Sequence, residues 1–171
     1  MAGPDQGLPL IAYVGLGSNL ADPLAQVHGA LEALAAITGC SRVRRSSLYA
    51  TSPVGPVVQP AFVNAVAALT TRLAPLDLLA ALQGIERAHG RVRDGTRWGP
   101  RTLDLDLLLY GELQLRTPDL ELPHPEIARR AFVLVPLAEI APAGLLIPGQ
   151  GTLGELLAAV ADVGGVRRIP D

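Results

Sequence analysis

The sequence predicts an α+β fold of the ferredoxin-like type, an antiparallel sheet in βαββαβ order with helices packed on it and additions at the C-terminal end. Three observations predict it. Strand and helix patterns follow this order between residues 10 and 110, both helical stretches open on a proline, and 49% of the 171 residues are hydrophobic, which is ample for one core. No linker or low-complexity stretch divides the chain, so we expect a single domain over residues 1–171.

The first predicted helix has both a start and a stop signal. It follows the apolar run at 10–16, which is typical of a buried strand. Asp22 is a suitable N-cap, Pro23 suits the first helical position, and apolar residues then recur at helical spacing. We expect Gly39 to end this helix in the left-handed conformation.

The later elements follow from the same kinds of signal. Apolar and β-branched runs bounded by turn residues predict strands, and leucines at helical spacing predict the second helix. The remaining core elements are strands at 42–50 and 62–71, a helix from Pro75 to Gly90 and a strand at 102–110. Beyond them we expect an edge hairpin at 113–122, a helical turn at 125–130, a strand at 132–137 and a helix at 152–161.

All 14 lysine and arginine positions are arginine, and this composition excludes several chemistries. Without lysine there can be no P-loop, whose lysine contacts phosphates, and no Schiff base. The net charge of −2 argues against non-specific DNA binding. A single cysteine, Cys40, allows no internal disulfide, and no segment has the character of a signal peptide or a membrane span, so we expect a cytoplasmic protein.

Two carboxylates alternate with leucines in the predicted strand at 102–110. The odd-numbered leucines from 103 to 109 should share one face, while Asp104 and Asp106 share the other, with Cα atoms about 6.6 Å apart. Their repulsion is about 2.5 kcal/mol at an effective dielectric constant near 20, so arginines or a metal ion should neutralise them. Carboxylates suit Mg²⁺, although two ordinary acids on a solvated strand face would give the same pattern.

An arginine-rich segment leads directly into this strand. Residues 89–101 combine three glycines, the single tryptophan, Trp98, and four arginines, which are Arg91, Arg93, Arg97 and Arg101. Guanidinium groups bind phosphate oxygens in a bidentate manner and stay charged. A surface loop with Trp98 tucked beneath it is the plain alternative. A positive segment beside paired acids is, however, what a nucleoside triphosphate and Mg²⁺ require.

A polar residue interrupts the apolar face of the predicted strand at 62–71. Asn64 follows a proline-braced loop at 51–60 and shares its face with Phe62. An amide among apolar neighbours needs hydrogen-bond partners, which a purely structural arrangement could supply. The functional alternative is an amide that pairs with the edge of a pterin or purine while Phe62 stacks on the ring.

These stretches together resemble the 6-hydroxymethyl-7,8-dihydropterin pyrophosphokinase family across nearly the whole chain. The resemblance runs from Tyr13–Leu20 (YVGLGSNL) to Phe132–Pro142 (FVLVPLAEIAP), and Arg97–Leu108 (RWGPRTLDLDLL) fits the family signature throughout. It implies a ferredoxin-like fold that holds ATP and the pterin side by side. It also implies transfer of the β,γ-diphosphate of ATP to the pterin's hydroxymethyl oxygen, with release of AMP, as a step of folate biosynthesis.

The resemblance also assigns site residues. It implies that Asp104 and Asp106 bind two Mg²⁺ ions and that Arg91 and Arg101 act on the phosphates. On the ATP side it implies Gln83, Glu86, Arg93, Arg97, Trp98, Leu107, His124 and Arg130. On the pterin side it implies Thr51, Ser52, Val54, Phe62, Asn64, Trp98 and Phe132.

Two other classes of protein are alternatives to this diphosphotransferase. A non-catalytic ferredoxin-like module that binds nucleotides or RNA would use exposed sheet aromatics and a basic surface, but only 4% of the residues are aromatic and the net charge is negative. A metal-dependent phosphohydrolase would need more acids or histidines than this aspartate pair supplies. We therefore expect a monomeric enzyme that binds neither nucleic acid nor membranes.

Overall fold

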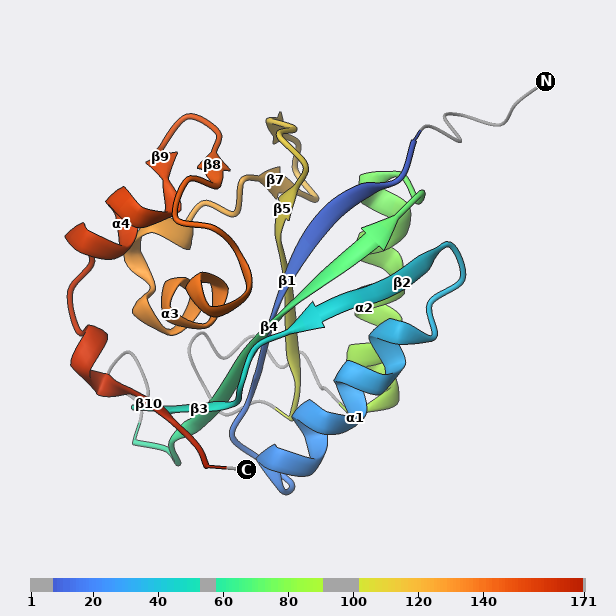
Figure 1. The fold of residues 1–171 in the computed structure, drawn as a ribbon. Coiled ribbons are helices and arrows are strands. Elements are labelled where there is room, and N and C mark those ends of the chain that lie inside the picture. Colours follow the sequence, from blue (N-terminus) through green and yellow to red (C-terminus); the bar gives the residue numbers. More distant parts are fainter. Residues whose placement is uncertain (1–7, 53–57, 91–101, 171) are drawn as a thin grey trace.

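A computed structural model describes residues 8–52, 58–90 and 102–170 of the chain. Its core elements follow the predicted order (Figure 1). They are β1 (Leu10–Ser18), α1 (Pro23–Ala35), β2 (Cys40–Arg45), β3 (Tyr49–Thr51), β4 (Phe62–Thr71), α2 (Pro75–Ala88) and β5 (Asp104–Tyr110). After these come β6 (Leu115–Arg116), β7 (Glu121–Leu122), the 3-10 turn η1 (Ile127–Arg129), α3 (Ala131–Ile140), β8 (Leu146–Ile147), β9 (Gly151–Thr152), α4 (Leu153–Ala159), a second 3-10 turn η2 (Val163–Gly165) and β10 (Val166–Arg168).

The main sheet is antiparallel and has β1 and β4 at its centre. Its strand order is β10-β3-β4-β1-β5, and β2 also pairs with β4. β2 lies against the C-terminal part of β4, whereas β3 lies against its first residues, where Thr51 faces Phe62 and Tyr49 faces Asn64. These pairings place the strands that carry Asn64 and Asp104 on either side of β1.

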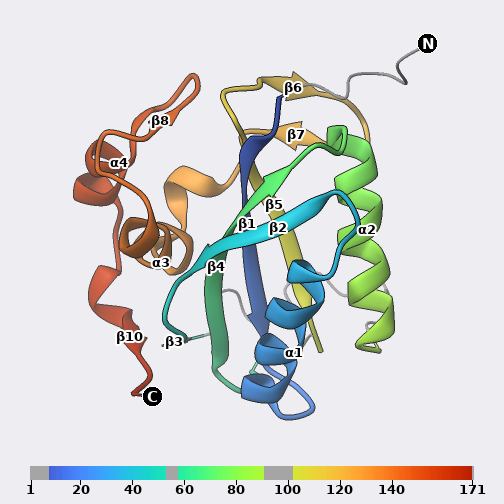
Figure 2. The ribbon, with the colours of Figure 1, turned by 45° about the vertical axis from the view of Figure 1, so that its right-hand side comes forward.

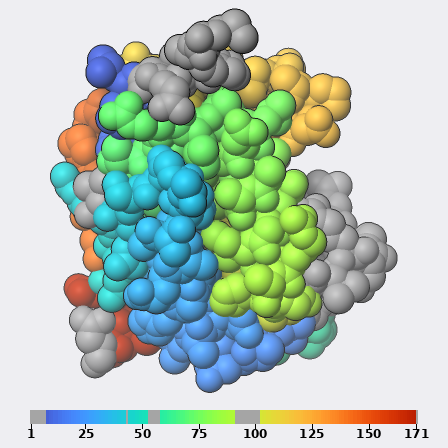
Figure 3. All heavy atoms as spheres, turned by 90° about the vertical axis from the view of Figure 1, so that its right-hand side faces the viewer, coloured from blue at the N-terminus to red at the C-terminus, as the bar shows by residue number. Residues whose placement is uncertain are grey.

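Two hydrophobic cores lie on opposite faces of this sheet. α1 and α2 cover one face, where Leu31 and Leu82 pack with Val14 of β1 and Leu69 of β4. Figures 1 and 2 show α3 and α4 beyond the other face, and Figure 3 shows α1 and α2 side by side over theirs. The second core joins α3 to β4 and β5 through Leu134 and its neighbours. None of the described helices is long and apolar enough to cross a membrane.

The predicted strand at 42–50 is wrong as a single element, because Ser46 divides it into β2 and β3. The backbone N–H of Ser46 donates to the carbonyl of Val66 at 2.8 Å, and its hydroxyl accepts from the N–H of Val66 at 2.9 Å. A side-chain oxygen thus replaces a backbone carbonyl in the ladder. The edge strand bends at this point and continues along β4 as a separate short strand.

The predicted strand at 132–137 is also wrong, since these residues lie within α3. Val133, Leu134, Leu137 and Ile140 are buried at helical spacing, and Pro136 is buried inside the helix. Because the segment is apolar almost throughout, its sequence carries no clear period, and short apolar runs do not distinguish a buried strand from a buried helix.

A β-bulge in β5 changes which leucines share a face. Val14 pairs with Leu107 and Tyr13 with Leu109, which leaves Leu108 as the extra residue. The leucines at 103, 105 and 107 share one face as predicted, and they pack against α1 and α2, but Leu109 joins Leu108 in the opposite core. The expectation that Leu109 shares the face of the other odd-numbered leucines is therefore wrong, because the bulge shifts the alternation by one residue.

The remaining elements are of the type that the sequence predicts, but their lengths differ from the predicted ones. α1 ends at Ala35, four residues before Gly39, which has a positive φ of 88° and turns the chain toward β2. The predicted hairpin at 113–122 is confirmed, although β6 and β7 form a small sheet of their own. The helical turn at 125–130 and the last helix are confirmed as η1 and α4. β10, which no pattern predicted, pairs with β3.

Candidate active site

A cavity of about 490 Å³ lies between the sheet and the segment that leads into α3. β1, β3, β4 and β5 form one side, and η1 with the first residues of α3 forms the other. Residues that were predicted for the ATP side and residues that were predicted for the pterin side line this cavity together. They are Thr51, Ser52, Phe62, Asn64, Asp104, Asp106, Arg130 and Phe132. The fold therefore joins four separate sequence segments in one site.

Asn64 and Thr51 form a buried polar pair at one end of this cavity. The amide Nδ2 of Asn64 donates to Thr51 Oγ1 at 2.6 Å, and the two side chains are 5% and 6% exposed. The opposite atom, Oδ1, lies beside Gly17, where a Cβ atom would come within 2.9 Å of it. Glycine at position 17 thus leaves room for the amide, whose orientation is fixed by the threonine.

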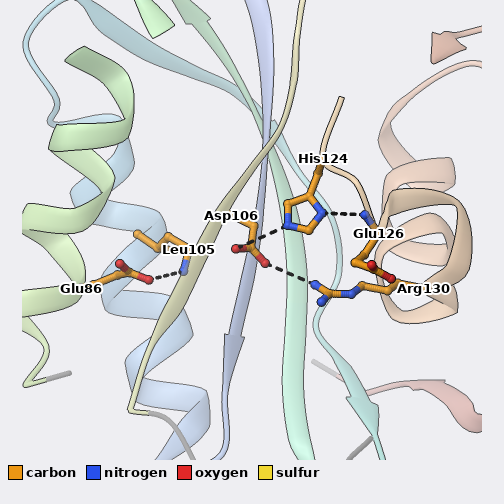
Figure 4. A network of polar contacts seen from close by, with 6 residues as sticks. All are labelled: Glu86, Leu105, Asp106, His124, Glu126 and Arg130. Atoms are coloured by element: carbon orange, nitrogen blue, oxygen red, sulfur yellow. Dashed lines mark hydrogen bonds and ion pairs between the residues drawn. The ribbon is translucent and has the colours of Figure 1, made fainter. Parts of the chain in front are cut away.

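Asp104 and Asp106 face the same cavity from β5, next to Gly17 and Gly15 of β1. One carboxylate oxygen of Asp106 lies 3.6 Å from Nη1 of Arg130, and the other lies 4.0 Å from Nε2 of His124 (Figure 4). Both distances exceed those of hydrogen bonds. The side chain of Asp106 is 31% exposed, so its oxygens can still reach a ligand in the cavity.

His124 is held beside Asp106 by its backbone and its ring. The backbone N–H of His124 donates to the carbonyl of Leu108 at 2.9 Å, and the ring atom Nδ1 accepts from the backbone N–H of Glu126 at 3.1 Å. The Nε2 atom therefore carries the proton and faces Asp106. Burial and the guanidinium of Arg130 lower the pKa of His124, against the opposing effect of Asp104, Glu126 and Glu121, and this favours the neutral ring.

The predicted ATP-side residues do not all face the cavity. Glu86 is 3% exposed, and its Oε2 accepts a hydrogen bond from the backbone N–H of Leu105 at 2.9 Å, on the α2 side of the sheet (Figure 4). Leu107 is buried in the core formed with α1 and α2, and Gln83 is half-buried on α2. Val54, Arg91, Arg93, Arg97, Trp98 and Arg101 lie outside the described residues.

The paired aspartates fit a magnesium site in the chemistry of their donors. Within the described segments, no group of three or more His, Cys, Asp or Glu side chains could hold a metal ion. Mg²⁺ does not require such a group, because it is commonly bound by one or two carboxylates together with substrate phosphates and water. Two carboxylates that line a cavity large enough for a substrate match this mode.

Several residues of the site were not predicted from the sequence. Glu126, Arg129 and Val133 line the cavity, and Arg129 Nη1 lies 3.7 Å from Glu126 Oε2. Asn19 is 2% exposed and donates to Gln59 Oε1 and to the carbonyl of Pro60, at 2.8 and 3.0 Å. It fastens the chain just before Phe62 to the end of β1. The signal available for Asn19 was its place in the turn after a buried strand.

Comparison with known proteins gives consistent matches over most of the chain. The family model for 7,8-dihydro-6-hydroxymethylpterin-pyrophosphokinase (HPPK) matches residues 13–142. A 2-amino-4-hydroxy-6-hydroxymethyldihydropteridine pyrophosphokinase of Pseudomonas aeruginosa is 55% identical over 158 residues, which cover 92% of this chain and 96% of that protein. Its counterpart in Haemophilus influenzae is 47% identical over 153 residues, which cover 90% and 94%.

Solved structures extend the likeness to the fold. Wild-type HPPK-DHPS of Plasmodium falciparum, crystallised with pteroate, has a TM-score of 0.70 at 13% sequence identity. The match covers 92% of this chain and 43% of that one, so the present chain spans less than half the length of the Plasmodium protein. The family match and the full-length bacterial relatives together place the chain in the 7,8-dihydro-6-hydroxymethylpterin-pyrophosphokinase family.

Proposed function

We propose that the chain transfers the β,γ-diphosphate of ATP to the hydroxymethyl oxygen of 6-hydroxymethyl-7,8-dihydropterin, which yields the pterin diphosphate and AMP in folate biosynthesis. The observation that carries the proposal is a single cavity with a buried amide–hydroxyl pair, Asn64 and Thr51, at one side and two carboxylates, Asp104 and Asp106, at another. The first pair suits a heterocycle edge, and the second suits metal-bound phosphates. Family membership supports the same reaction.

The pterin end is proposed to hold the ring between two aromatic side chains. Phe62 and Phe132 line the cavity from β4 and α3, and each is half-buried. The guanidinium of Arg130 lies 5.5 Å from the centre of the Phe132 ring, a distance typical of a cation–π contact, and this holds the ring at the cavity edge. Asn64 and Thr51 would then bond the polar edge of the pterin, and Ser52 and Val54 would complete this end.

At the nucleotide end, Asp104 and Asp106 would hold two Mg²⁺ ions. Bound Mg²⁺ would neutralise charge on the phosphates during the transfer. Arg130 and His124 flank the carboxylate of Asp106, which lines the cavity. We further propose, from the family pattern, that Arg91, Arg93, Arg97 and Arg101 contact the phosphates, with Gln83, Glu86, Trp98 and Leu107 on the nucleoside side.

The proposed step is a direct in-line transfer without a covalent enzyme intermediate. The pterin's hydroxymethyl oxygen forms a bond to the β-phosphorus and loses its proton, while the bond from that phosphorus to the α,β-bridging oxygen breaks. AMP leaves with the bridging oxygen. The protein contributes mainly by holding both substrates in line and by stabilising charge, as is general for phosphoryl transfer.

We propose a ferredoxin-like topology with C-terminal additions and a monomeric cytoplasmic enzyme.

A coupled assay for AMP tests this function. We expect AMP to form only when ATP, Mg²⁺ and the hydroxymethyl dihydropterin are all present, with one AMP for each pterin diphosphate. Release of ADP or inorganic phosphate with the same substrates would contradict a diphosphate transfer. AMP formation that does not depend on the pterin would instead indicate a nucleotide hydrolase.

A further inference from the structure

Glu139, in the last turn of α3, bonds this helix to the bend between β2 and β3. Its carboxylate accepts from the backbone N–H of Ser47 at 2.9 and 3.0 Å and from the Ser47 hydroxyl at 2.7 Å. It also accepts from the hydroxyl of Tyr49 at 2.5 Å. Hydrogen bonds to an ionised acceptor are stronger than those between neutral groups. One side chain of α3 therefore fixes the start of β3 through Ser47 and Tyr49.

Tyr49 connects this contact to the cavity wall. It is 8% exposed and lies directly opposite Asn64 in the pairing of β3 with β4, so the two side chains are neighbours on one face of the sheet. Thr51, two residues further along β3, shares that face and accepts the hydrogen bond from Asn64. A buried phenol hydroxyl needs a partner, and Glu139 supplies it. Movement of Tyr49 would therefore displace the amide–hydroxyl pair.

The same helix supplies the opposite wall. Phe132 and Val133, at the start of α3, line the cavity across from Thr51 and Asn64. A second bond supports the far end of the helix, where Nη1 of Arg44 donates to the carbonyl of Ile140 at 3.0 Å. One rigid element thus carries one wall at its first turn and is bonded to the strand of the other wall at its last turn.

From this arrangement we propose that Glu139 is a positioning residue that sets the spacing between the two walls of the pterin-binding end. The inference rests on the proposed function, because it assigns that end of the cavity to the pterin. The hydrogen bonds described for Glu139 go to Ser47 and Tyr49. Glu139 therefore acts on the site through Tyr49 and α3 rather than through Asp104 or Asp106. Its loss should therefore weaken pterin binding while metal and nucleotide binding stay nearly unchanged.

The test compares substitutions on both sides of the contact with a matched control. Glu139→Ala removes the whole contact, Tyr49→Phe removes one bond, and Glu139→Gln keeps an oxygen that accepts from Ser47. Glu155→Ala is the control, because Glu155 is also an exposed helical carboxylate with a hydroxyl partner, Thr152 at 3.0 Å, and lies on α4 outside the cavity. For each protein, KM for pterin and for ATP, kcat, the melting temperature and direct pterin binding by fluorescence titration are measured.

We expect Glu139→Ala to raise KM and Kd for the pterin about tenfold, with KM for ATP and kcat within about twofold of wild type. Glu139→Gln should recover part of this loss, Tyr49→Phe should give a smaller loss, and Glu155→Ala should give none. Equal changes in the constants for both substrates, or a lower melting temperature with unchanged pterin constants, would overturn the inference. If Glu139→Ala does not fold, normal pterin constants for both Glu139→Gln and Tyr49→Phe would overturn it as well. Failure of the wild-type chain to bind pterin would instead refute the proposed function.

Discussion

The carboxylate of Glu86 accepts a hydrogen bond from the backbone N–H of Leu105, at 2.9 Å, between the two aspartates of β5. α2 thereby fixes the strand at the residue that separates Asp104 from Asp106. A carboxylate that is only 3% exposed is costly to bury unless it is hydrogen-bonded, so this contact stabilises both partners. Glu86 supports the aspartate pair from the face of the sheet opposite the cavity.

Replacing Glu86 should therefore affect both stability and turnover. Glu86→Ala leaves the N–H of Leu105 without this acceptor, and we expect a loss of about 1–3 kcal/mol in the free energy of unfolding, measured in urea. Glu86→Gln keeps an acceptor oxygen and should lose less. We also expect Mg²⁺ to bind more weakly, which the AMP assay would show as a higher half-saturating Mg²⁺ concentration. An unchanged half-saturating Mg²⁺ in a destabilised Glu86→Ala protein would show that the contact supports the fold alone.

Asp106→Ala tests the metal role directly. We expect turnover to fall by about two orders of magnitude or more, because the substitution removes a carboxylate proposed to hold Mg²⁺. The side chain is 31% exposed and contributes little to the core, so the melting temperature should change little. Glu112→Ala, which removes an exposed acid in the turn after β5, should retain full turnover. Near-normal activity of Asp106→Ala would rule out the proposed metal role.

Gly17→Ala should weaken pterin binding by moving Asn64. The added Cβ would lie 2.9 Å from Oδ1 of Asn64, so the amide must shift away from its present position. We expect a rise in KM for the pterin of about tenfold, with KM for ATP little changed. Gly15→Ala is a useful comparison on the same strand, since its Cβ would meet Leu108 at an ordinary 3.5 Å. Equal effects of the two alanines on pterin binding would disprove this role of Gly17.

The contact between Glu139 and Tyr49 should make stability depend on pH in a defined direction. Partial burial alone would raise the pKa of Glu139, but the hydrogen bonds from Tyr49 and Ser47 outweigh it and hold the pKa below its ordinary 4.5. The ionised carboxylate therefore stabilises the fold above the unfolded-state pKa, and this contribution is lost as the pH falls through the folded-state pKa.

The difference in free energy of unfolding between wild type and Glu139→Gln should accordingly be largest near neutral pH. It should shrink below about pH 4.5, where the unfolded chain takes up the proton first. Urea unfolding of both proteins at a series of pH values measures this difference. A constant difference from pH 7 to pH 3 would show that the charge of Glu139 contributes nothing.

Local patterns predicted the core of the fold but not its departures from regularity. β4 and the start of α2 match the predicted residues, because Phe62–Thr71 and Pro75 have clear boundaries in the sequence. The bend at Ser46 and the bulge at Leu108 could not be predicted, since each depends on what the neighbouring strand offers for hydrogen bonding. α3 was missed for a different reason, namely that burial on all sides removes the period by which a helix is recognised.

The site could be predicted where its residues carry a chemical pattern and not where they act through others. Asp104 and Asp106 stand out by their spacing alone, and Asn64 by its polarity within an apolar strand. Glu139 and Asn19 bind partners far away in the sequence, so only the folded chain shows what they do. The residues at 91–101 keep their predicted roles as predictions.

The pairing of β10 with β3 bears on how the molecule is made. β3 carries Thr51 and lies between β4 and β10, which the ribosome finishes at very different times. A nascent chain that already has β1 to β5 can assemble the aspartate side of the site, but the strand of Thr51 still has an open edge until Val166–Arg168 emerges. Synthesis therefore passes through a stage in which β3 is paired with β4 along one edge while its other edge is open.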